Sequence, residues 1–318
     1  MSNRDILLRQ ISAKKPRLKP TSANSYLMKL KCINKGLGVE NEYDLEAIKH
    51  KDIIDEYLQG FKLNTRKTYL GAIITILDCC AEDCEEELKE YRKDLEAFQS
   101  DTRKAEEKQE KTARQDENWV SLKDLREVLE EYKKKIDLKN FDETEEISKR
   151  DFDLLQKYLV GMLYIGDVDN HPPLRLDYAP MVIKHISKWE KATEKENSLV
   201  IINKDKKFFS LVDYKTEGTY GLKTIQVSPE LNDTINFWLK FNKSKSFLLN
   251  QRLKPMTAND LSKYIVKVFS PTGKKIGATM LRHIVISELF PARLEEQQKT
   301  ADLMLHSINQ QNLYAKKI

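Results

Sequence analysis

A stretch of charged and polar residues interrupts the apolar periodicity of this sequence and divides it into two parts. Residues 102–118 read TRKAEEKQEKTARQDEN and contain no apolar stripe, although apolar residues recur at helical spacing up to Ser100. Such a segment cannot bury enough apolar surface to join a core, so it forms a solvated helix or a flexible tether. Because apolar patterns resume at Trp119, we expect two hydrophobic cores joined by a charged linker over residues 101–118.

The composition is compatible with two globular domains. The 318 residues allow one large domain or two ordinary ones, and a hydrophobic content of 40% supports real cores. The net charge of +5 is by itself weak evidence for a nucleic-acid partner. The distribution of charge says more, because acidic residues crowd into residues 82–146 while the first twenty residues are basic, with no acid after Asp5.

The sequence contains no feature that predicts a membrane, a secretory signal or a metal. No apolar run approaches the roughly 18–20 residues that span a bilayer, and the start, MSNRDILLRQ, lacks a long apolar segment. We therefore expect a soluble, intracellular protein. The cysteines Cys32, Cys79, Cys80 and Cys84 include no CxxC pair, and no histidine follows them at zinc-finger spacing. A zinc site is the alternative, but the spacing favours reduced thiols packed in a helix.

The N-terminal part is predicted to be helical and able to bind DNA. Residues 1–20 are basic and contain two prolines, so we expect a flexible arm that lies along phosphates or stays disordered. Residues 21–100 show apolar helical periodicity bounded by capping residues and glycines, typical of a small helical domain. Arg66 and Lys67 follow the predicted helix start at Asn64, where the helix dipole disfavours cations. They face an anion such as phosphate, or they occupy a solvated first turn.

The C-terminal part, residues 119–318, is predicted to combine helices with a small sheet. Four β-branched or aromatic runs, separated by charged or glycine turns, predict an antiparallel sheet. These runs are residues 181–186, 199–202, 208–212 and 224–227. Helices are predicted at 121–136, 152–165, 229–241, 257–269, 278–290 and 293–305. The expected fold class is therefore mainly α with a small antiparallel β-sheet, arranged as a helical N-terminal domain and a mixed C-terminal domain.

Five residues of this C-terminal part follow one another in the order Arg, Lys, Arg, His, Tyr. They are Arg175, Lys215, Arg282, His306 and Tyr314. This order, the Leu281-Arg282-His283 run and the His-Ser pair eight positions before the tyrosine resemble the tyrosine recombinases, the family of phage integrases, Xer and Cre. The Pro-Pro-Leu-Arg-Leu-Asp-Tyr form around Arg175 looks like a variant from recombinases of eukaryotic viruses and mobile elements. The common pattern instead has Gly-Leu before the arginine and a glutamate after it.

The resemblance implies a site-specific DNA recombinase or integrase that cuts and rejoins DNA without metal or other cofactor. In that family a tyrosine, here Tyr314, attacks the phosphate and forms a 3′-phosphotyrosyl bond. Arg175, Arg282 and His306 would hold the phosphate, since guanidinium groups stay charged and bind its oxygens in a planar fork. Lys215, in a hairpin loop, would protonate the departing 5′ oxygen. A free tyrosine has a pKa of about 10, so it needs this cationic surrounding.

Several positions either support the resemblance or depart from it. Asp177 is the candidate acid that orients Arg175, and His283 lies beside the second arginine. Three positions before that arginine the family has histidine or lysine, but this chain has Thr279, which donates a hydrogen bond and cannot carry a proton at neutral pH. Either Lys215 then supplies the proton alone, or activity is reduced. Three other lysines compete with Lys215 for this role: Lys206, Lys207 and Lys223.

The resemblance also implies partners and leaves alternative functions open. Two domains would clamp double-stranded DNA, with Lys263 and Lys267 of the 257–269 helix entering a major groove. We expect a homotetramer on paired DNA sites, in the host cytoplasm or nucleus if the source is viral. Many members have a further helix after the tyrosine, whereas four residues follow Tyr314 here, so the assembly contact is unspecified. The alternatives are a weakly active or inactive DNA-binding protein on this fold, and a telomere resolvase or type-IB topoisomerase.

Overall fold

The chain folds into two compact units, and the boundary between them along the sequence falls within the predicted linker. The computed structural model describes residues 2–107, 110–139, 141 and 146–289. Unit 1 covers Met1–Glu110 and unit 2 covers Lys111–Ile318. The first predicted domain was placed up to residue 100, but helix α5 (Glu85–Glu107) continues beyond it. A further short helix, α6 (Ala113–Glu117), lies in the rest of the predicted linker and begins at a Thr112 capping box.

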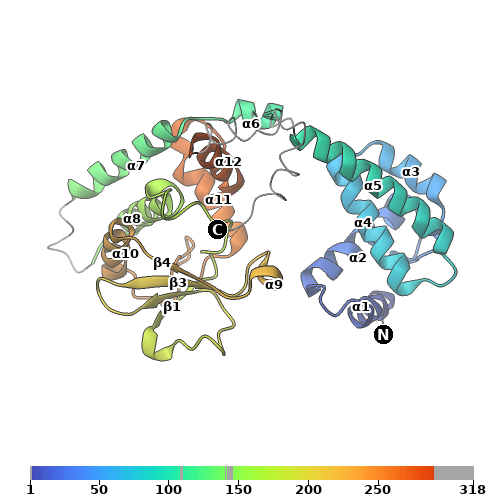
Figure 1. Ribbon diagram of the computed structural model, residues 1–318, viewed down its shortest axis with the longest axis horizontal. Coiled ribbons are helices and arrows are strands. Elements are labelled where there is room, and N and C mark those ends of the chain that lie inside the picture. Colours follow the sequence, from blue (N-terminus) through green and yellow to red (C-terminus); the bar gives the residue numbers. More distant parts are fainter. Residues whose placement is uncertain (1, 108–109, 140, 142–145, 290–318) are drawn as a thin grey trace, which may run out of the picture. The chain divides into compact units, whose positions relative to one another are not determined.

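Within the described residues, unit 1 consists of helices around a core of its own (Figure 1). Its elements before α5 are α1 (Asn3–Lys14), α2 (Pro20–Gly36), the 3₁₀-helix η1 (Ala47–Lys49), α3 (Lys51–Gln59) and α4 (Leu63–Cys80). Helix α4 contacts α1, α2 and α5, so it is the centre of the unit. Apolar residues on several sides of α4 make this possible: Leu70, Ala72, Ile73, Ile76, Leu77 and Cys79 are all buried.

The prediction of a flexible arm over residues 1–20 is wrong, because helix α1 occupies most of this segment. Ser2 caps the helix by accepting a hydrogen bond from the Asp5 backbone N–H. Leu7 and Ile11 are buried in the core of unit 1, with Ile11 fully inaccessible. Residues four positions apart share one helix face, so two apolar residues suffice to anchor a segment whose composition is basic.

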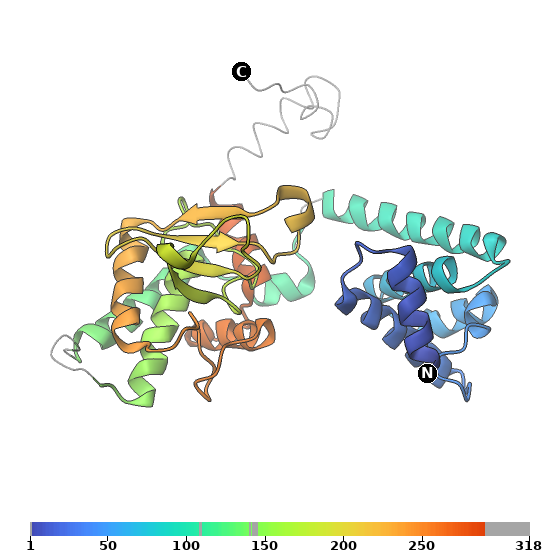
Figure 2. The same ribbon diagram turned by 90° about the horizontal axis from the view of Figure 1, so that it is seen from below.

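Unit 2 contains the other helices and all the strands of the described chain (Figures 1 and 2). Its helices after α6 are α7 (Leu122–Asp137), α8 (Lys149–Gly161), the π-helix η3 (Met162–Gly166), α9 (Glu217–Tyr220), α10 (Pro229–Phe241), α11 (Ala258–Val268) and α12 (Ala278–Leu289). Two 3₁₀-helices, η4 (Ile186–Lys188) and η5 (Ser270–Thr272), complete the list. Capping boxes start α7 at Ser121 and α11 at Thr257, the positions at which the sequence predicted these two helices to begin.

The four strands form one sheet in the order β1-β2-β3-β4. The strands are β1 (Val182–His185), β2 (Ser198–Ile201), β3 (Lys207–Leu211) and β4 (Lys223–Gln226). The fold class, mainly helical with a small sheet, is confirmed, but the sheet is mixed and not antiparallel. Strand β1 pairs with β2 in parallel, while β2–β3 and β3–β4 are antiparallel. The segment between β1 and β2 runs back to the start of β1, where Val182 donates to the Asn197 carbonyl at 3.0 Å.

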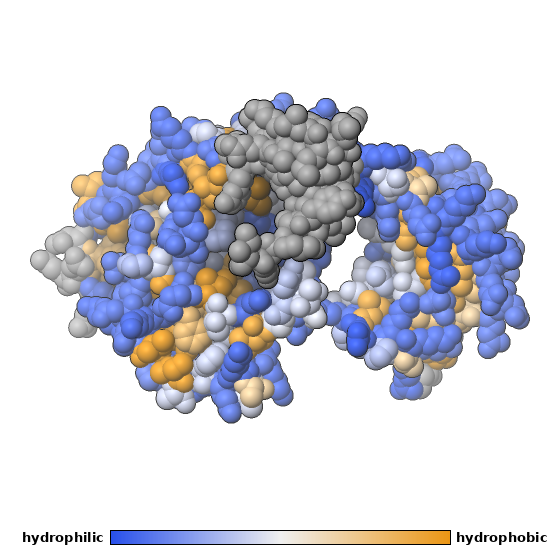
Figure 3. Space-filling view, viewed as in Figure 1, coloured by the Kyte–Doolittle hydropathy of each residue, from blue (hydrophilic) through white to orange (hydrophobic). Residues whose placement is uncertain are grey.

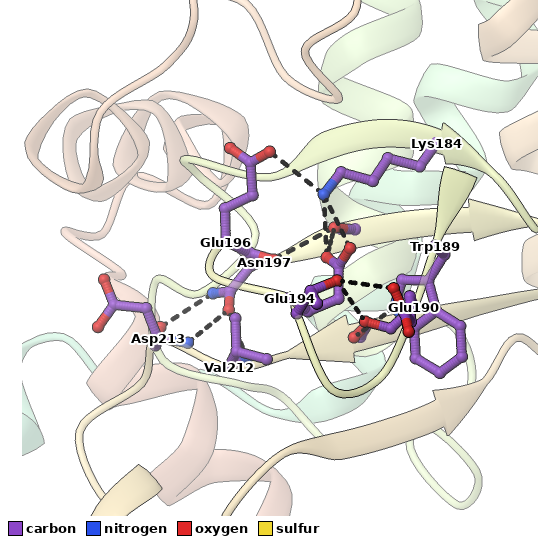
Figure 4. Close-up of polar contacts among 11 residues, drawn as sticks. Lys184, Trp189, Glu190, Glu194, Glu196, Asn197, Val212 and Asp213 are labelled. Carbon is purple, nitrogen blue, oxygen red and sulfur yellow. Dashed lines mark hydrogen bonds and ion pairs between the residues drawn. The ribbon is translucent and has the colours of Figure 1, made fainter.

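Strand β3 is buried along its whole length and joins two sides of unit 2. On one face Phe209 packs against Tyr178 and Phe247, with ring centroids 5.2 and 6.0 Å apart. On the other face Phe208 packs against Trp189 of the β1–β2 connection at 5.0 Å. Figure 4 shows this connection, in which Glu194 and Glu196 form ion pairs with Lys184 of β1. The connection therefore covers one face of the sheet, and the helical core covers the other.

Three of the four cysteines are partly or fully buried in unit 1. Cys79 and Cys84 are buried, Cys80 is half-buried, and burial raises the pKa of all three thiols. The described ranges contain no cluster of three or more His, Cys, Asp or Glu able to hold a metal ion. Across these ranges we also find no helix with the length and apolarity that a membrane crossing requires. Hydrophilic residues cover much of the visible face of each unit (Figure 3).

His171 lies buried beside the N-terminus of α10 and joins it to the loop after η3. Its Nε2 accepts a hydrogen bond from the Ser228 backbone N–H at 2.9 Å, and its side chain is only 2% exposed. Burial lowers the pKa of the histidine, although the nearby Asp167 carboxylate and the Gln226 backbone act in the opposite direction. The neutral ring is required as an acceptor here, so protonation disrupts this contact.

Replacement of Ile11 by alanine is expected to destabilise unit 1 by about 2–4 kcal/mol, because it leaves a cavity under α1. Chemical denaturation followed by circular dichroism measures this change. The matched control is Ile6→Ala in the same helix, where the side chain is 43% exposed and the expected loss is within about 0.5 kcal/mol. Equal effects of the two substitutions would contradict the packing of α1.

Acidification is expected to destabilise unit 2 through His171. Its folded-state pKa is lowered, so the unfolded chain takes up the proton first, and stability falls as the pH drops below the unfolded pKa of about 6.5. Tryptophan fluorescence during denaturation reports on unit 2 alone, since Trp119, Trp189 and Trp238 all belong to it. His171→Gln should flatten the pH dependence between pH 7 and about pH 5. An unchanged slope would mean that burial does not perturb this histidine.

Candidate functional site

A pocket of about 340 Å³ in unit 2 brings together three of the residues that the sequence predicted for the site. They are Arg175, Asp177 and Arg282. The other lining residues are Pro173, Leu174, Leu211, Tyr214, Thr216, Lys223, Thr224 and Ile225. The pocket thus lies between the Arg175 loop, one end of β3 and β4, the β3–β4 connection and helix α12.

A buried tyrosine stabilises the loop that carries Arg175. Tyr164, in the π-helix η3, donates a hydrogen bond from its hydroxyl to the Arg175 backbone carbonyl at 2.5 Å. Its ring packs edge-on against Tyr178, with centroids 5.8 Å apart. Burial raises the pKa of the Tyr164 phenol well above its ordinary value, so this group remains a donor. The backbone at Arg175 is therefore fixed, while its side chain is exposed.

Arg282 reaches the same pocket from helix α12 and has unused hydrogen-bonding capacity. Its Nη2 lies 3.4 Å from the Thr279 hydroxyl, a long contact. Its Nε is buried and has no hydrogen-bond partner among the residues described. Buried donors are normally satisfied, and exceptions call for an explanation such as a bound anion. Thr279 thus contacts the arginine in the place where the recombinase pattern has a histidine or lysine.

Asp177 is half-buried at the edge of the pocket. Burial raises the pKa of its carboxyl above the ordinary value, although the guanidinium groups of Arg175 and Arg282 act in the opposite direction. The carboxylate is therefore within electrostatic range of both arginines. No hydrogen bond joins the Asp177 carboxylate to either guanidinium among the described residues, so its orienting role stays a prediction.

The lysine that lines the pocket is Lys223, and Lys215 is not among the lining residues. Lys215 is exposed in the turn that follows β3. Lys223 is the first residue of β4, opposite Leu211 of β3, and its ammonium lies 5.6 Å from the Tyr220 ring centre. Gly221, at φ 63°, turns the chain from α9 into β4 and accepts a hydrogen bond from the Tyr214 hydroxyl at 2.6 Å. Lys223, two residues after this turn, is one of the residues that line the pocket.

The two remaining candidate lysines are Lys206, in the β2–β3 turn, and Lys207, the first residue of β3. Lys206 is exposed, whereas Lys207 is 1% exposed. The Lys207 ammonium donates to the Lys204 carbonyl at 2.7 Å and to the side-chain oxygens of Asn232 and Asn236 at 2.7 and 2.6 Å. Burial lowers the pKa of Lys207. Its three donors are engaged, so it stabilises the contact of the sheet with α10.

Three predicted site residues remain to be placed: His283, His306 and Tyr314. His306 and Tyr314 lie outside the described residues, as does the helix predicted at 293–305. His283 is exposed on α12 and is not among the residues that line the pocket. The structure therefore brings together the two arginines and the aspartate of the prediction, and their relation to the proposed nucleophile stays a prediction.

The proposed DNA-binding residues of unit 1 have partners inside that unit. Arg66 donates from Nε to the Phe61 carbonyl at 2.9 Å and from Nη2 to the Gln59 carbonyl, at the end of α3. Lys67 donates to the Thr102 hydroxyl on α5 at 3.1 Å. The cations at the start of α4 are therefore stabilised by carbonyl and hydroxyl oxygens, which accounts for their position without a phosphate.

Helix α11 has one exposed and one paired lysine. Lys263 is exposed, whereas Lys267 lies 3.0 Å from the Asp153 carboxylate. A shallow pocket of about 430 Å³ places both lysines beside Arg252, which the sequence interpretation did not select. Arg252 belongs to a tight turn, where Leu253 has φ 57° and is 52% exposed. The basic character of this surface therefore depends on the turn as well as on the helix.

No protein-family model, curated protein or solved structure matches this chain. The site must therefore be interpreted from its own chemistry. The lining residues include three cations and one carboxylate, a combination suited to an anion with several oxygen atoms. Sequence order alone selected the two arginines, whereas Lys223 was only one of several lysines in turns and strands.

Inorganic phosphate is expected to bind in this pocket and to raise the melting temperature of unit 2. Lys223→Ala should weaken phosphate binding by about tenfold or more, because hydrogen bonds to charged groups contribute about 1.5–3 kcal/mol. The control is Lys215→Ala, eight positions earlier in the same connection, which should leave phosphate affinity unchanged. Titration calorimetry measures both constants. A loss in Lys215→Ala with none in Lys223→Ala would reverse the assignment.

Proposed function

We propose that this protein is a site-specific DNA recombinase that cleaves and rejoins double-stranded DNA through a covalent phosphotyrosyl intermediate. The observation that carries the proposal is the pocket lined by Arg175 and Arg282, from distant parts of the sequence, and by Lys223 at the start of β4. The order of these residues with His306 and Tyr314 supplies the resemblance to tyrosine recombinases.

In the proposed reaction, the Tyr314 phenolate attacks the phosphorus atom of one strand. A bond forms between the tyrosine oxygen and phosphorus, and the bond from phosphorus to the 5′ oxygen breaks. Arg175 and Arg282 neutralise the charge on the non-bridging oxygens, which grows in the transition state. The departing 5′ oxygen takes a proton from a lysine. The energy of the phosphodiester is retained in the 3′-phosphotyrosyl bond, so a partner 5′-hydroxyl can reverse the reaction.

The position of the lysine changes the predicted general acid. The sequence predicted Lys215 as the general acid because it falls in a hairpin loop. Lys223 lines the same pocket as the arginines and is therefore the better candidate for this role. Thr279 stays in contact with Arg282 and supports its guanidinium group without moving a proton. Double-stranded DNA, a homotetramer on paired sites and integration of a virus or mobile element remain parts of the proposal that rest on the resemblance.

The decisive experiment is covalent trapping on nicked suicide duplexes with randomised sequence around the nick, in the presence of EDTA. A slow-migrating adduct on a denaturing gel is expected with the wild-type chain and is expected to disappear in Tyr314→Phe. Tyr220→Phe is the matched control, since Tyr220 is 60% exposed in the same unit and is not assigned to the reaction. Arg175→Ala and Arg282→Ala should slow adduct formation by about 100- to 1000-fold.

The other outcomes identify the alternative functions. Tight binding of the duplex library without any adduct would favour a DNA-binding protein that does not cleave. An adduct on every sequence, together with relaxation of supercoiled plasmid, would favour a type-IB topoisomerase. An adduct that persists in Tyr314→Phe would exclude this tyrosine as the nucleophile.

A further inference from the structure

Asn197 joins two backbone segments, each of which continues into the lining of the arginine pocket. It lies immediately before β2 and is 2% exposed. Its Nδ2 donates to the Asp177 carbonyl at 3.1 Å and to the Asp213 carbonyl at 3.0 Å. Its Oδ1 accepts from the backbone N–H groups of Val212 and Asp213, both at 2.9 Å. Figure 4 shows this side chain directed at Val212 and Asp213.

All the hydrogen-bonding positions of the Asn197 amide are used. A carboxamide offers two donors and two acceptor sites, and the contacts above fill each of them. A buried network of this kind is rigid, because losing one partner leaves a buried polar group unsatisfied. No other single residue type of this size supplies two donors and two acceptors in one plane.

The backbone segments that Asn197 contacts also contribute residues to the lining of the pocket. Asp177 lines it, and Arg175 lies two residues before Asp177 in the same loop. On the other side, Asp213 is followed by Tyr214, which lines the pocket as part of the connection between β3 and β4. The amide therefore fixes the spacing between the arginine loop and this connection.

The segment that carries Asn197 is itself held in place. Lys184 of β1 lies 2.9 Å from the Glu194 carboxylate and 3.3 Å from that of Glu196. Glu194 also accepts a hydrogen bond from the Ser198 hydroxyl at 3.0 Å. The backbone carbonyl of Asn197 accepts from Val182. The asparagine is thus anchored to the sheet on both sides of its own position.

We infer that Asn197 is a positioning residue of the anion site: it sets the place of Arg175 relative to the β3–β4 connection. The inference rests on the proposed function insofar as the ligand is a phosphodiester. Arg282 belongs to helix α12, which has no hydrogen bond to Asn197. Loss of Asn197 therefore displaces the Arg175 side of the pocket and leaves the Arg282 side in place.

The test compares Asn197→Ala with Asn242→Ala in the full-length protein. Asn242 is the matched control, because it is 5% exposed and its amide also joins backbone groups, donating to the carbonyls of Ser246 and Phe247 and accepting from Ser244. It does not line the arginine pocket. Both variants should show similar falls in melting temperature, and measurements are made well below either transition.

Inorganic phosphate is the probe, with titration calorimetry and NMR of the arginine Nε–Hε groups as readouts. We expect Asn197→Ala to weaken phosphate binding by about tenfold or more and Asn242→Ala to leave it unchanged. In Asn197→Ala the phosphate-induced shift of the Arg175 signal should be lost, and that of Arg282 should remain. Asn197→Ser, with a smaller change in volume, replaces Asn197→Ala if the latter does not fold.

The outcomes separate this inference from the proposed function. If the wild type binds phosphate, Arg175→Ala abolishes binding, and Asn197→Ala binds as tightly as Asn242→Ala, the inference is overturned and the site stands. Equal loss of the Arg175 and Arg282 signals would also overturn it, since that indicates general unfolding of the pocket. If the wild type binds no phosphate, the anion site fails, and the positioning role fails with it.

Discussion

The burial of β3 on both faces is the constraint on which unit 2 depends. A strand in this position needs apolar cover on each side and a partner for every polar group. Phe209 meets the helical core, and Phe208 meets Trp189 of the β1–β2 connection. The polar atoms are satisfied in the same way, since Ser210 accepts from the Trp189 indole and Lys207 donates to three oxygens. The sheet is small, but its central strand determines what packs around it.

This constraint also positions the candidate site. Where β3 ends, the backbone at Val212 and Asp213 leaves the sheet and is paired by the Asn197 amide. The same amide holds the loop of Arg175, which Tyr164 supports from the helical side. Arg175 therefore lies on a backbone segment fixed by buried polar contacts, an arrangement that limits the reorganisation needed when an anion binds.

Local signals in the sequence predicted local structure well, and non-local contacts account for the differences. Capping boxes start helices α7 and α11 at Ser121 and Thr257, where the sequence predicted their starts, since a capping box involves residues only three positions apart. The parallel pairing of β1 and β2 was not predicted, because it depends on how the connection folds back. Helix α1 was missed because the basic composition of residues 1–20 was given more weight than the apolar pair Leu7 and Ile11. That pair stabilises the helix only by packing against α4, a contact that the local sequence does not reveal.

The sequence by itself determined the division into two helical units with one small sheet, and it selected Arg175, Asp177 and Arg282 through order and chemistry. Only the tertiary structure decided which lysine accompanies them, because the sequence offers Lys215 before α9 and Lys223 after it, and of these two only Lys223 lines the pocket. It also revealed Asn197, whose role depends on four contacts with residues distant in sequence. Side-chain chemistry is legible in a sequence, whereas the meeting of distant backbone segments is a property of the packed core.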